Sequence, residues 1–484
     1  MHGPAPSALF STDFPVLFTV ALIFSTIILA YIWTSSKNKL NSDSDKRVES
    51  PARVPNNSLF TITPFFHQRF NFLNWGFKKT GEPIFQFSLL QNQVIVLSGE
   101  TAREAFFSTK GLDLTEGFKL LSGAIPVVRG VTSEYQTKRI ALIHKRLTSV
   151  QTDDRLGFLI PAILEDSCRL MDSWGPSGTF DPFERIYELV FQTTVRSLSC
   201  PEIANDAAIV SRLRELYDTL DTGTTPTSVL LPWLPSLGML KKLWASKEIY
   251  YIVIAAIKRR KECDIPKDDT LQMLLDSGDD KETIVGFIMG LLIAGARATG
   301  TTTCWLSIFL GTYQDWRQKA KREVEDLLFS YSSSASERLS SRLSSIPLEA
   351  WESSTPVLDA IIRETLRVAE PYSAMRKNLG SDVYIDGKLI PSGAYVVYPF
   401  SDVHLNPDLY PDPWKFDPGR NYESAEASTY GYVGWGQGIE LGFSGTWSLF
   451  LVYRKDFLPR ATSGQGRNEA HCFHVPDGLQ SSGG

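Results

Sequence analysis

The chain has 484 residues, of which 43% are hydrophobic and 12% aromatic, so it is long enough to bury a large core. Its formal net charge of −5 gives no electrostatic reason to expect a nucleic-acid partner. The five cysteines have no C-x-x-C spacing, which argues against a disulfide framework or a zinc site and favours a reducing compartment; they are Cys168, Cys200, Cys263, Cys304 and Cys472.

A run without charge lies close to the N-terminus. Residues 14–33 are twenty uncharged, mostly apolar residues, enough to span a bilayer as a helix. Basic residues follow this run but do not precede it, so the positive-inside rule places residues 1–13 in the lumen and the bulk of the chain in the cytosol. We predict an uncleaved membrane anchor at 14–33, followed by a basic and Pro-containing hinge at 34–55. A cleaved signal peptide is the alternative, and the length of the run and the missing basic n-region disfavour it.

The next segments alternate between strand and loop patterns. Residues 83–90 and 93–98 read as two strands of a hairpin separated by a Gln-Asn turn. A helix is predicted from Thr101, with the threonine as its cap. Residues 111–131 are apolar and read as a loop.

Helical patterns dominate the middle of the chain. Residues 136–147 form a basic helix, and its cations could meet a bound anionic group or an acidic partner, although a solvated basic face is the alternative; they are Lys138, Arg139, Lys145 and Arg146. Residues 155–200 are amphipathic helix, typical of scaffold. A Thr/Pro-rich apolar connection follows at 221–237, and residues 330–354 read as a serine-rich surface insertion.

A long apolar helix is predicted at 282–313. It contains Ala294 and Gly295, followed by Thr299. Read from the residues alone, it is a buried helix in which Gly and Thr serve close packing.

The stretch from Pro356 to Gly438 contains the motifs around which the rest of the chain is interpreted. An amphipathic helix places Glu364 and Arg367 three residues apart on one side, within pairing reach. A strand is predicted around Arg376, and residues 382–390 read as a hairpin closed by Asp386-Gly387. His404 is interpreted as a structural histidine with satisfied hydrogen bonds rather than as a metal ligand, because it has no partner ligand nearby in the sequence. A Pro-rich turn segment and a glycine-dense loop follow at 411–420 and 432–438.

The order and spacing of these motifs carry a resemblance that none of them carries alone. They are Glu364-x-x-Arg367, His404-Leu405-Asn406-Pro407, Phe416-Asp417-Pro418-Gly419-Arg420 and Gly434-Trp435-Gly436-Gln437-Gly438. This series resembles the cytochrome P450 heme-thiolate monooxygenases. The resemblance implies one mainly α domain with small β-sheets over residues 56–438, the cytochrome P450 fold, incomplete at the C-terminus and preceded by one transmembrane helix.

Roles for individual residues follow from the resemblance. Glu364, Arg367 and Arg420 correspond to a buried structural triad. Ala294, Gly295 and Thr299 correspond to the part of the distal helix that crosses the heme, with Thr299 in proton delivery. The residues that correspond to heme contacts are Arg139, Arg376, Trp435, Gly436 and Gly438.

The activity implied is insertion of one atom of O2 into an apolar substrate, lipid, sterol or secondary-metabolite-like, as in fungal members. Heme b would be the cofactor, and electrons would come from NADPH through NADPH-cytochrome P450 reductase. The protein would be a single-pass protein of the endoplasmic reticulum membrane.

Two departures from the family pattern bear on this expectation. The acid usual before the distal threonine is Ala298 here, which leaves the proton relay open. The thiolate cysteine expected at position 442 is Gly442, and residues 439–484 form a divergent tail without family pattern. The chain as written is therefore predicted to be inactive, and a shifted reading frame or a retained intron would explain the abrupt change.

Two other functions remain open. A heme-less, non-catalytic membrane protein is one. An isomerase or dehydratase on the same fold, working without O2 or reductase, is the other.

Overall fold

The structure is a computed structural model, and it describes residues 50–54, 58–122, 146, 149–150, 152–175, 178–231, 234–263, 267–332, 336–369 and 372–434. Several predictions fall outside these residues and are not tested: the anchor at 14–33, Arg139, Trp435, Gly436, Gly438, Gly442 and the tail at 439–484.

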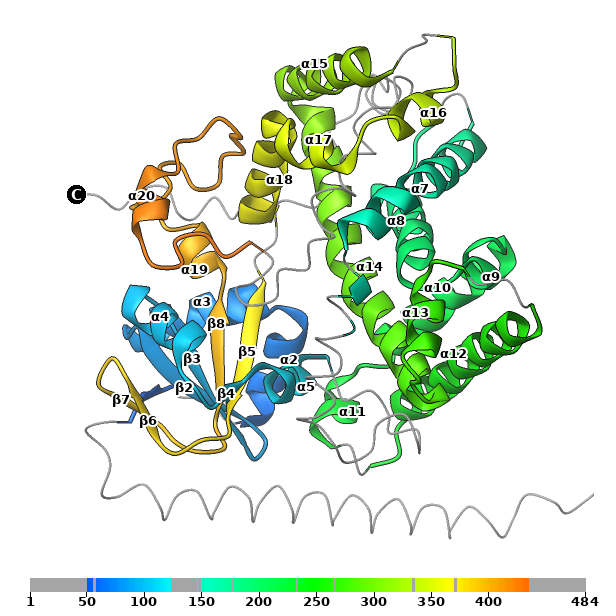
Figure 1. The fold of residues 1–484 in the computed structure, drawn as a ribbon. Coiled ribbons are helices and arrows are strands. Elements are labelled where there is room, and N and C mark those ends of the chain that lie inside the picture. The colour runs from blue at the N-terminus through cyan, green and yellow to red at the C-terminus, as the bar shows by residue number, and fades with distance from the viewer. Residues whose placement is uncertain are drawn as a thin grey trace, which may run out of the picture.

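A six-stranded sheet forms one side of the molecule, with strand order β1-β2-β3-β8-β5-β4 (Figure 1). Its strands are β1 (Ala52–Arg53), β2 (Ile84–Leu89), β3 (Asn92–Leu97), β4 (Leu112–Asp113), β5 (Ser373–Asn378) and β8 (Tyr395–Pro399). The predicted hairpin is β2–β3, with Phe85 opposite Val96. The sheet joins both ends of the described chain, because β3 pairs with β8, and β8 pairs in turn with β5. A separate ribbon of β6 (Val383–Ile385) and β7 (Lys388–Ile390) turns at Asp386 and Gly387, both at positive φ as the Asp-Gly turn requires.

Helices of the N-terminal part cover the sheet: α2 (Ser58–His67), α3 (Arg69–Thr80), α4 (Glu100–Ser108) and α5 (Leu114–Ser122). Two predictions here were wrong. Helix α4 begins at Glu100 after Gly99, and Thr101 does not cap it. Residues 114–122 are helix α5 rather than loop, because Gly117 lets the helix lie directly on the backbone of β5, where a Cβ would be 2.2 Å from the Met375 carbonyl oxygen.

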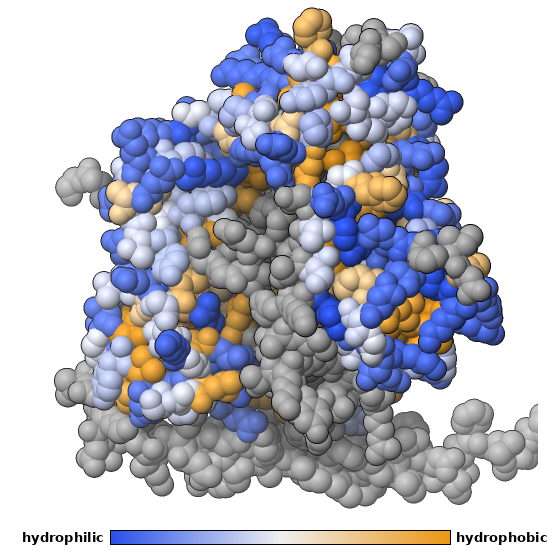
Figure 2. Space-filling view, in the orientation of Figure 1, coloured by the Kyte–Doolittle hydropathy of each residue, from blue (hydrophilic) through white to orange (hydrophobic). Residues whose placement is uncertain are grey.

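The other side of the molecule is helical (Figure 1). Its helices are α7 (Asp153–Ser173), α8 (Pro182–Leu198), α9 (Pro201–Ala204), α10 (Ala207–Thr222), α11 (Pro226–Leu230), α12 (Leu237–Glu262), α13 (Thr270–Asp276), α14 (Lys281–Thr312) and α15 (Gln314–Tyr331). The apolar connection predicted at 221–237 thus contains the short helix α11. Hydrophilic residues cover most of the described surface on the face in Figure 2, and hydrophobic ones show mainly between elements.

Helix α14 runs through the middle of the molecule, as its apolar sequence predicts (Figure 1). By length and composition it could cross a membrane, but more than half of its most apolar window is buried inside the protein. It packs along α8 and against α18 (Pro356–Ala369). Burial on both sides is the ordinary reason for such an apolar helix in a protein core.

The serine-rich segment is not a loose surface insertion. It contains α16 (Leu339–Ser344) and α17 (Leu348–Ser353). Leu343, Ile346 and Trp351 from this segment are all buried in the core beneath α7 and α18. Three large apolar side chains outweigh the polar composition of the segment, so the prediction of a surface insertion was wrong for these helices.

Candidate functional site

Helix α18 presents a buried ion pair. Its apolar residues Leu358, Ile361 and Leu366 are buried, and Glu364 and Arg367 follow on the same inner side. Arg367 Nη2 donates to Glu364 Oε1 at 2.7 Å and Arg367 Nε donates to Oε2 at 2.8 Å, with both side chains 0% exposed. A fork of this kind matches the geometry of a carboxylate and satisfies two donors away from water.

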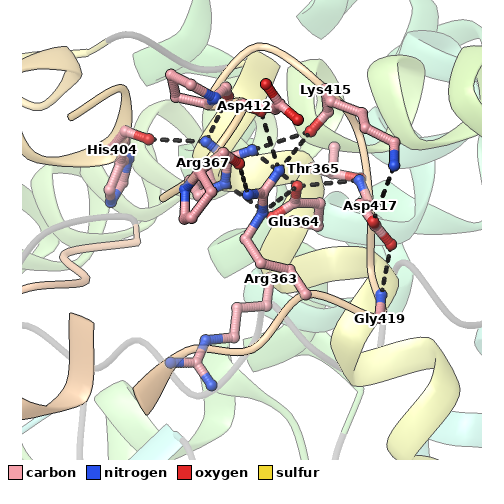
Figure 3. A network of polar contacts seen from close by, with 12 residues as sticks. Arg363, Glu364, Thr365, Arg367, His404, Asp412, Lys415, Asp417 and Gly419 are labelled. Atoms are coloured by element: carbon pink, nitrogen blue, oxygen red, sulfur yellow. Dashed lines mark hydrogen bonds and ion pairs between the residues drawn. The ribbon is translucent and has the colours of Figure 1, made fainter. Parts of the chain in front are cut away.

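The turn segment adds further donors to the same carboxylate (Figure 3). Arg420 Nε lies 3.4 Å from Glu364 Oε1, and the Asp417 backbone N–H donates to that oxygen at 3.0 Å. The Tyr422 hydroxyl donates to Glu364 Oε2 at 2.7 Å. The structure therefore brings Glu364, Arg367 and Arg420 together, as the sequence predicts.

Tyr422 is a member of this network that sequence reasoning missed. Its position two residues after Arg420 carries no motif, and only the return of the chain to α18 brings it to Glu364. Burial, and after it the nearby Glu364 carboxylate, raise the pKa of Tyr422 far above its usual range, so the hydroxyl remains a donor.

Arg367 also donates hydrogen bonds to backbone carbonyl groups in the turn segment and at His404, before it. It donates to the carbonyl oxygens of His404 at 2.7 Å, Pro413 at 2.6 Å and Lys415 at 3.1 Å (Figure 3). Arg420 donates to the carbonyl oxygens of Pro411 and Asp412. The segment has little regular structure of its own, so these two guanidinium groups supply the hydrogen bonds that helix or sheet would otherwise supply.

Arg376 projects from β5 beside two aromatic rings. Its guanidinium carbon lies 5.1 Å from the ring centre of Phe106 and 5.8 Å from that of Phe107. Burial lowers its pKa, and among the described residues its Nε atom is buried without a hydrogen-bond partner. A half-buried guanidinium whose buried Nε is a spare donor fits an anionic group, such as a heme propionate.

Residues of α14 show how the helix packs. Gly295 faces α8, where a Cβ would lie 3.1 Å from Leu198 Cδ1 and 3.2 Å from Thr194 Cγ2. Thr299 is buried, and its carbonyl oxygen accepts from the Thr303 hydroxyl at 2.7 Å. The glycine contact is what the close-packing interpretation expects. Roles for Ala294, Gly295 and Thr299 against a heme remain predictions.

His404 is buried, and only one of its ring nitrogens is satisfied, so the predicted full set of hydrogen bonds is not found among the described residues. Its Nε2 accepts from the Val433 backbone N–H at 3.1 Å, whereas Nδ1 is buried without a partner among the described residues. Burial and the charges of Arg367 and Arg103 lower the pKa of His404 to about 3, so the ring is neutral.

Arg146, from the predicted basic helix, is already paired. Both of its bonds to the Asp279 carboxylate are short, with Nε 2.8 Å from Oδ2 and Nη2 2.9 Å from Oδ1. A guanidinium held this way by a neighbouring carboxylate is a structural ion pair. The expectation that Arg146 could meet a propionate or an acidic partner is therefore not supported by its contacts.

Of the groups that a heme presents, its propionates find a matching side chain among the described residues, but its iron does not. Arg376 suits a propionate, but the described residues contain no group of three or more His, Cys, Asp or Glu side chains that could hold a metal ion. Cys200 and Cys304 are buried within the helical side, where the Cys304 thiol donates to the Pro182 carbonyl oxygen at 3.3 Å. At position 442, glycine has no side-chain ligand atom. Position 442 therefore offers no thiolate, and the loss of activity expected from this stays a prediction.

Comparisons with known proteins agree with the geometry. The family model described as Cytochrome P450 matches residues 51–439. The chain is 32% identical to cytochrome P450 monooxygenase AacuE of Aspergillus aculeatus, over 81% of each chain. It is 28% identical to lanosterol 14-alpha demethylase of Mus musculus, over 76% of this chain and 72% of that protein. The solved structure of retinoic acid-bound cyanobacterial CYP120A1 shares the fold, with a TM-score of 0.66, 22% identity, and 83% of this chain and 90% of the other covered.

Proposed function

Because the chain belongs to the cytochrome P450 family, we propose that its fold serves heme b-dependent monooxygenation, with one oxygen atom of O2 inserted into an apolar substrate. The single observation that carries this proposal is the carboxylate of Glu364, which joins Arg367, Arg420, Asp417 and Tyr422. That network holds the turn segment against α18 and leads the chain toward the glycine-rich loop. Electrons would come from NADPH through NADPH-cytochrome P450 reductase.

The substrate class rests on relatives. One is a fungal monooxygenase, and another is named for the demethylation of lanosterol, a sterol. A lipid, sterol or secondary-metabolite-like substrate is therefore proposed, reached by a protein anchored in the endoplasmic reticulum membrane through residues 14–33. The Thr299 hydroxyl on α14 would hold a water near the reacting oxygen.

The chain as written does not complete this site. A cysteine at position 442 would hold the heme iron through its thiolate and supply electron density for oxygen activation, and position 442 has glycine. We therefore propose that the printed chain is inactive in monooxygenation, and that residues 439–484 arise from a shifted reading frame or a retained intron rather than from gradual loss. The network around Glu364 supports this, because a fold long released from selection would not keep a carboxylate with so many matched donors.

The first experiment is to sequence the spliced transcript across the codons for residues 434–444. A cysteine encoded four residues after Gly438 would support the monooxygenase proposal and make the tail an artefact of the gene prediction. A transcript that encodes Gly442 and the printed tail would remove the thiolate and overturn the proposal for this protein.

Two other functions are separated by a second experiment. Purified protein is reconstituted with hemin, and its Soret absorbance and carbon monoxide difference spectrum are recorded. A protein that retains no heme would support a non-catalytic membrane protein. Ala298, in the place of the usual acid, favours an isomerase or dehydratase as the second enzymatic candidate; turnover that needs neither NADPH nor reductase would identify it.

A further inference from the structure

Residues 428–433, the last two of which begin the glycine-dense loop at 432–438, are held by α4 on one side. Glu100 Oε1 accepts from the Ser428 hydroxyl at 2.5 Å and from the Thr429 backbone N–H at 3.0 Å. Arg103, which is buried, donates to the Thr429 carbonyl oxygen at 3.0 Å and to the Ser428 hydroxyl at 2.8 Å. More than 320 residues separate these partners in sequence, so only the tertiary fold makes the contacts.

The same segment is held on its other side by the turn segment and α18. The Tyr410 hydroxyl donates to the Gly431 carbonyl oxygen at 2.7 Å, and both groups are buried. The Tyr432 hydroxyl donates to the Arg363 carbonyl oxygen at 3.2 Å, and the Arg363 guanidinium lies 4.9 Å from the centre of the Tyr432 ring. Residues 428–432 are therefore restrained one after another.

His404 makes the last contact before the loop. Its Nε2 accepts from the Val433 N–H at 3.1 Å, and its ring stacks on Tyr432 with centres 5.2 Å apart and planes at 27°. Its own carbonyl oxygen accepts from Arg367 Nη1 at 2.7 Å. One residue thus touches the Glu364–Arg367 pair through its backbone and the loop segment through its side chain.

The contact at Nε2 determines which ring nitrogen of His404 carries the proton. Because Nε2 accepts a hydrogen bond, the proton of the neutral ring is on Nδ1, and that N–H is buried without a partner among the described residues. An unsatisfied buried donor costs about 1–3 kcal/mol. An apolar residue would avoid this cost but would leave the Val433 N–H without its acceptor.

We propose that His404 is a positioning residue that couples the Glu364–Arg367 pair to the first residues of the glycine-rich loop. Its imidazole works as a fixed acceptor at the Nε2 position, which holds Val433 and therefore sets where Gly434 leaves the core. The proposal concerns contacts within this chain and needs no cofactor. It stands independently of the proposed monooxygenase activity, although a fixed loop is what a heme-binding fold requires.

The test is hydrogen exchange of the full chain without cofactor, resolved to the Val433 amide by mass spectrometry with fragmentation. His404→Gln places an acceptor oxygen near the Nε2 position, whereas His404→Asn reaches only the Nδ1 position. Tyr410→Phe is the matched control, because it removes a neighbouring contact of the segment but leaves the acceptor of Val433 in place. Urea unfolding of each variant gives its global stability for comparison.

We expect the Val433 amide to exchange about tenfold faster in His404→Asn than in the wild type, as loss of one hydrogen bond implies. His404→Gln should restore most of the protection, and Tyr410→Phe should leave the Val433 amide unchanged. Equal rates in the Gln and Asn variants would overturn the proposal. So would faster exchange in His404→Asn that is spread evenly over the whole chain, because it would reveal only global destabilisation.

Discussion

Glu364 illustrates how one buried carboxylate can organise a region of irregular backbone. Its two oxygens accept from Arg367, Asp417 and Tyr422, with Arg420 at 3.4 Å. A charge in this position is tolerated only because every partner is in place, since an unpaired buried ion loses several kcal/mol of hydration.

Glu364→Gln should destabilise the protein by about 3–5 kcal/mol, because it leaves the Arg367 guanidinium buried without an opposite charge. The measurement is the urea midpoint of the full chain. Glu116→Gln is the matched control: Glu116 also pairs with a cation three residues on, Lys119, at 2.5 Å, but this pair is partly exposed. The control should change stability by about 0–1 kcal/mol. Similar losses in the two variants would contradict the structural role of Glu364.

His404 predicts a dependence of stability on pH. Its pKa in the folded protein is about 3, below the ordinary value near 6.5, so the unfolded chain takes up a proton first as the pH falls. Stability is therefore lost below about pH 6.5, and the loss between pH 7 and pH 5 is about 2 kcal/mol. Urea unfolding of the wild type and of His404→Gln at both pH values tests this. The wild type should lose more stability than the variant, and parallel losses would show that His404 is not the group involved.

At the scale of elements, the crossing of α14 and α8 depends on glycine. A Cβ at residue 300 would lie 2.6 Å from Tyr187 Cδ2, and one at residue 295 would lie 3.1 Å from Leu198 Cδ1. These positions let the two helices approach closely along the centre of the molecule. Gly290, in the same helix, has open space around the corresponding position.

The contrast between Gly300 and Gly290 gives a paired prediction. Gly290→Ala should stabilise the protein by about 0.5–1 kcal/mol, through the better helix propensity of alanine. Gly300→Ala gains the same propensity but must displace the Tyr187 ring, so we expect net destabilisation from an overpacking cost of about 1–3 kcal/mol. Thermal unfolding of both variants measures the difference. A stabilised Gly300→Ala variant would show that α8 moves away without cost.

At the scale of the whole molecule, the helical and sheet sides are joined through α18 and the turn segment. Phe416 stacks on Phe309 of α14 with ring centres 4.1 Å apart, and Glu323 of α15 accepts from the Val357 and Leu358 N–H groups at the start of α18. On the sheet side, Asp402 accepts from the Ser98 hydroxyl and the Gly99 N–H. Unfolding of either side should therefore affect the other.

Native-state thiol labelling tests whether the helical side unfolds as one unit. Cys263 is exposed at the end of α12 and should react at once with a thiol reagent. Cys200 and Cys304 are fully buried, and burial raises the pKa of the Cys200 thiol, so both should react only when the molecule unfolds. Mass spectrometry of labelled peptides gives the order. Labelling of Cys200 well before Cys304 in mild denaturant would show that the helical side opens in parts.

Local patterns were enough to predict several elements. The β2–β3 and β6–β7 hairpins, the long helix α14 and the helix α18 all follow from periodicity and turn residues that act within a few positions. The pairing of Glu364 with Arg367 follows from helical spacing alone. Arg420 was assigned to this pair by the order of motifs, not by any local signal.

Two of the failures share one physical cause. The sequence of residues 114–122 predicts a loop, but helix α5 forms there, with Gly117 packed against the backbone of β5. Helix α17 is buried because its Trp351 side chain packs in the core. Thr101 does not cap α4, which begins one residue earlier. The first two outcomes depend on residues distant in sequence, whereas the third is a local difference of one residue.

The sequence by itself therefore determined the family, the order of the main elements and the absence of a thiolate at position 442, because motifs and ligand atoms can be read residue by residue. Only the tertiary structure decided that Tyr422 belongs to the Glu364 network, that α4 holds residues 428–429, and that His404 accepts from Val433. These contacts join segments up to 329 residues apart. No local pattern encodes them, since hydrogen bonds across such distances exist only once the chain has folded.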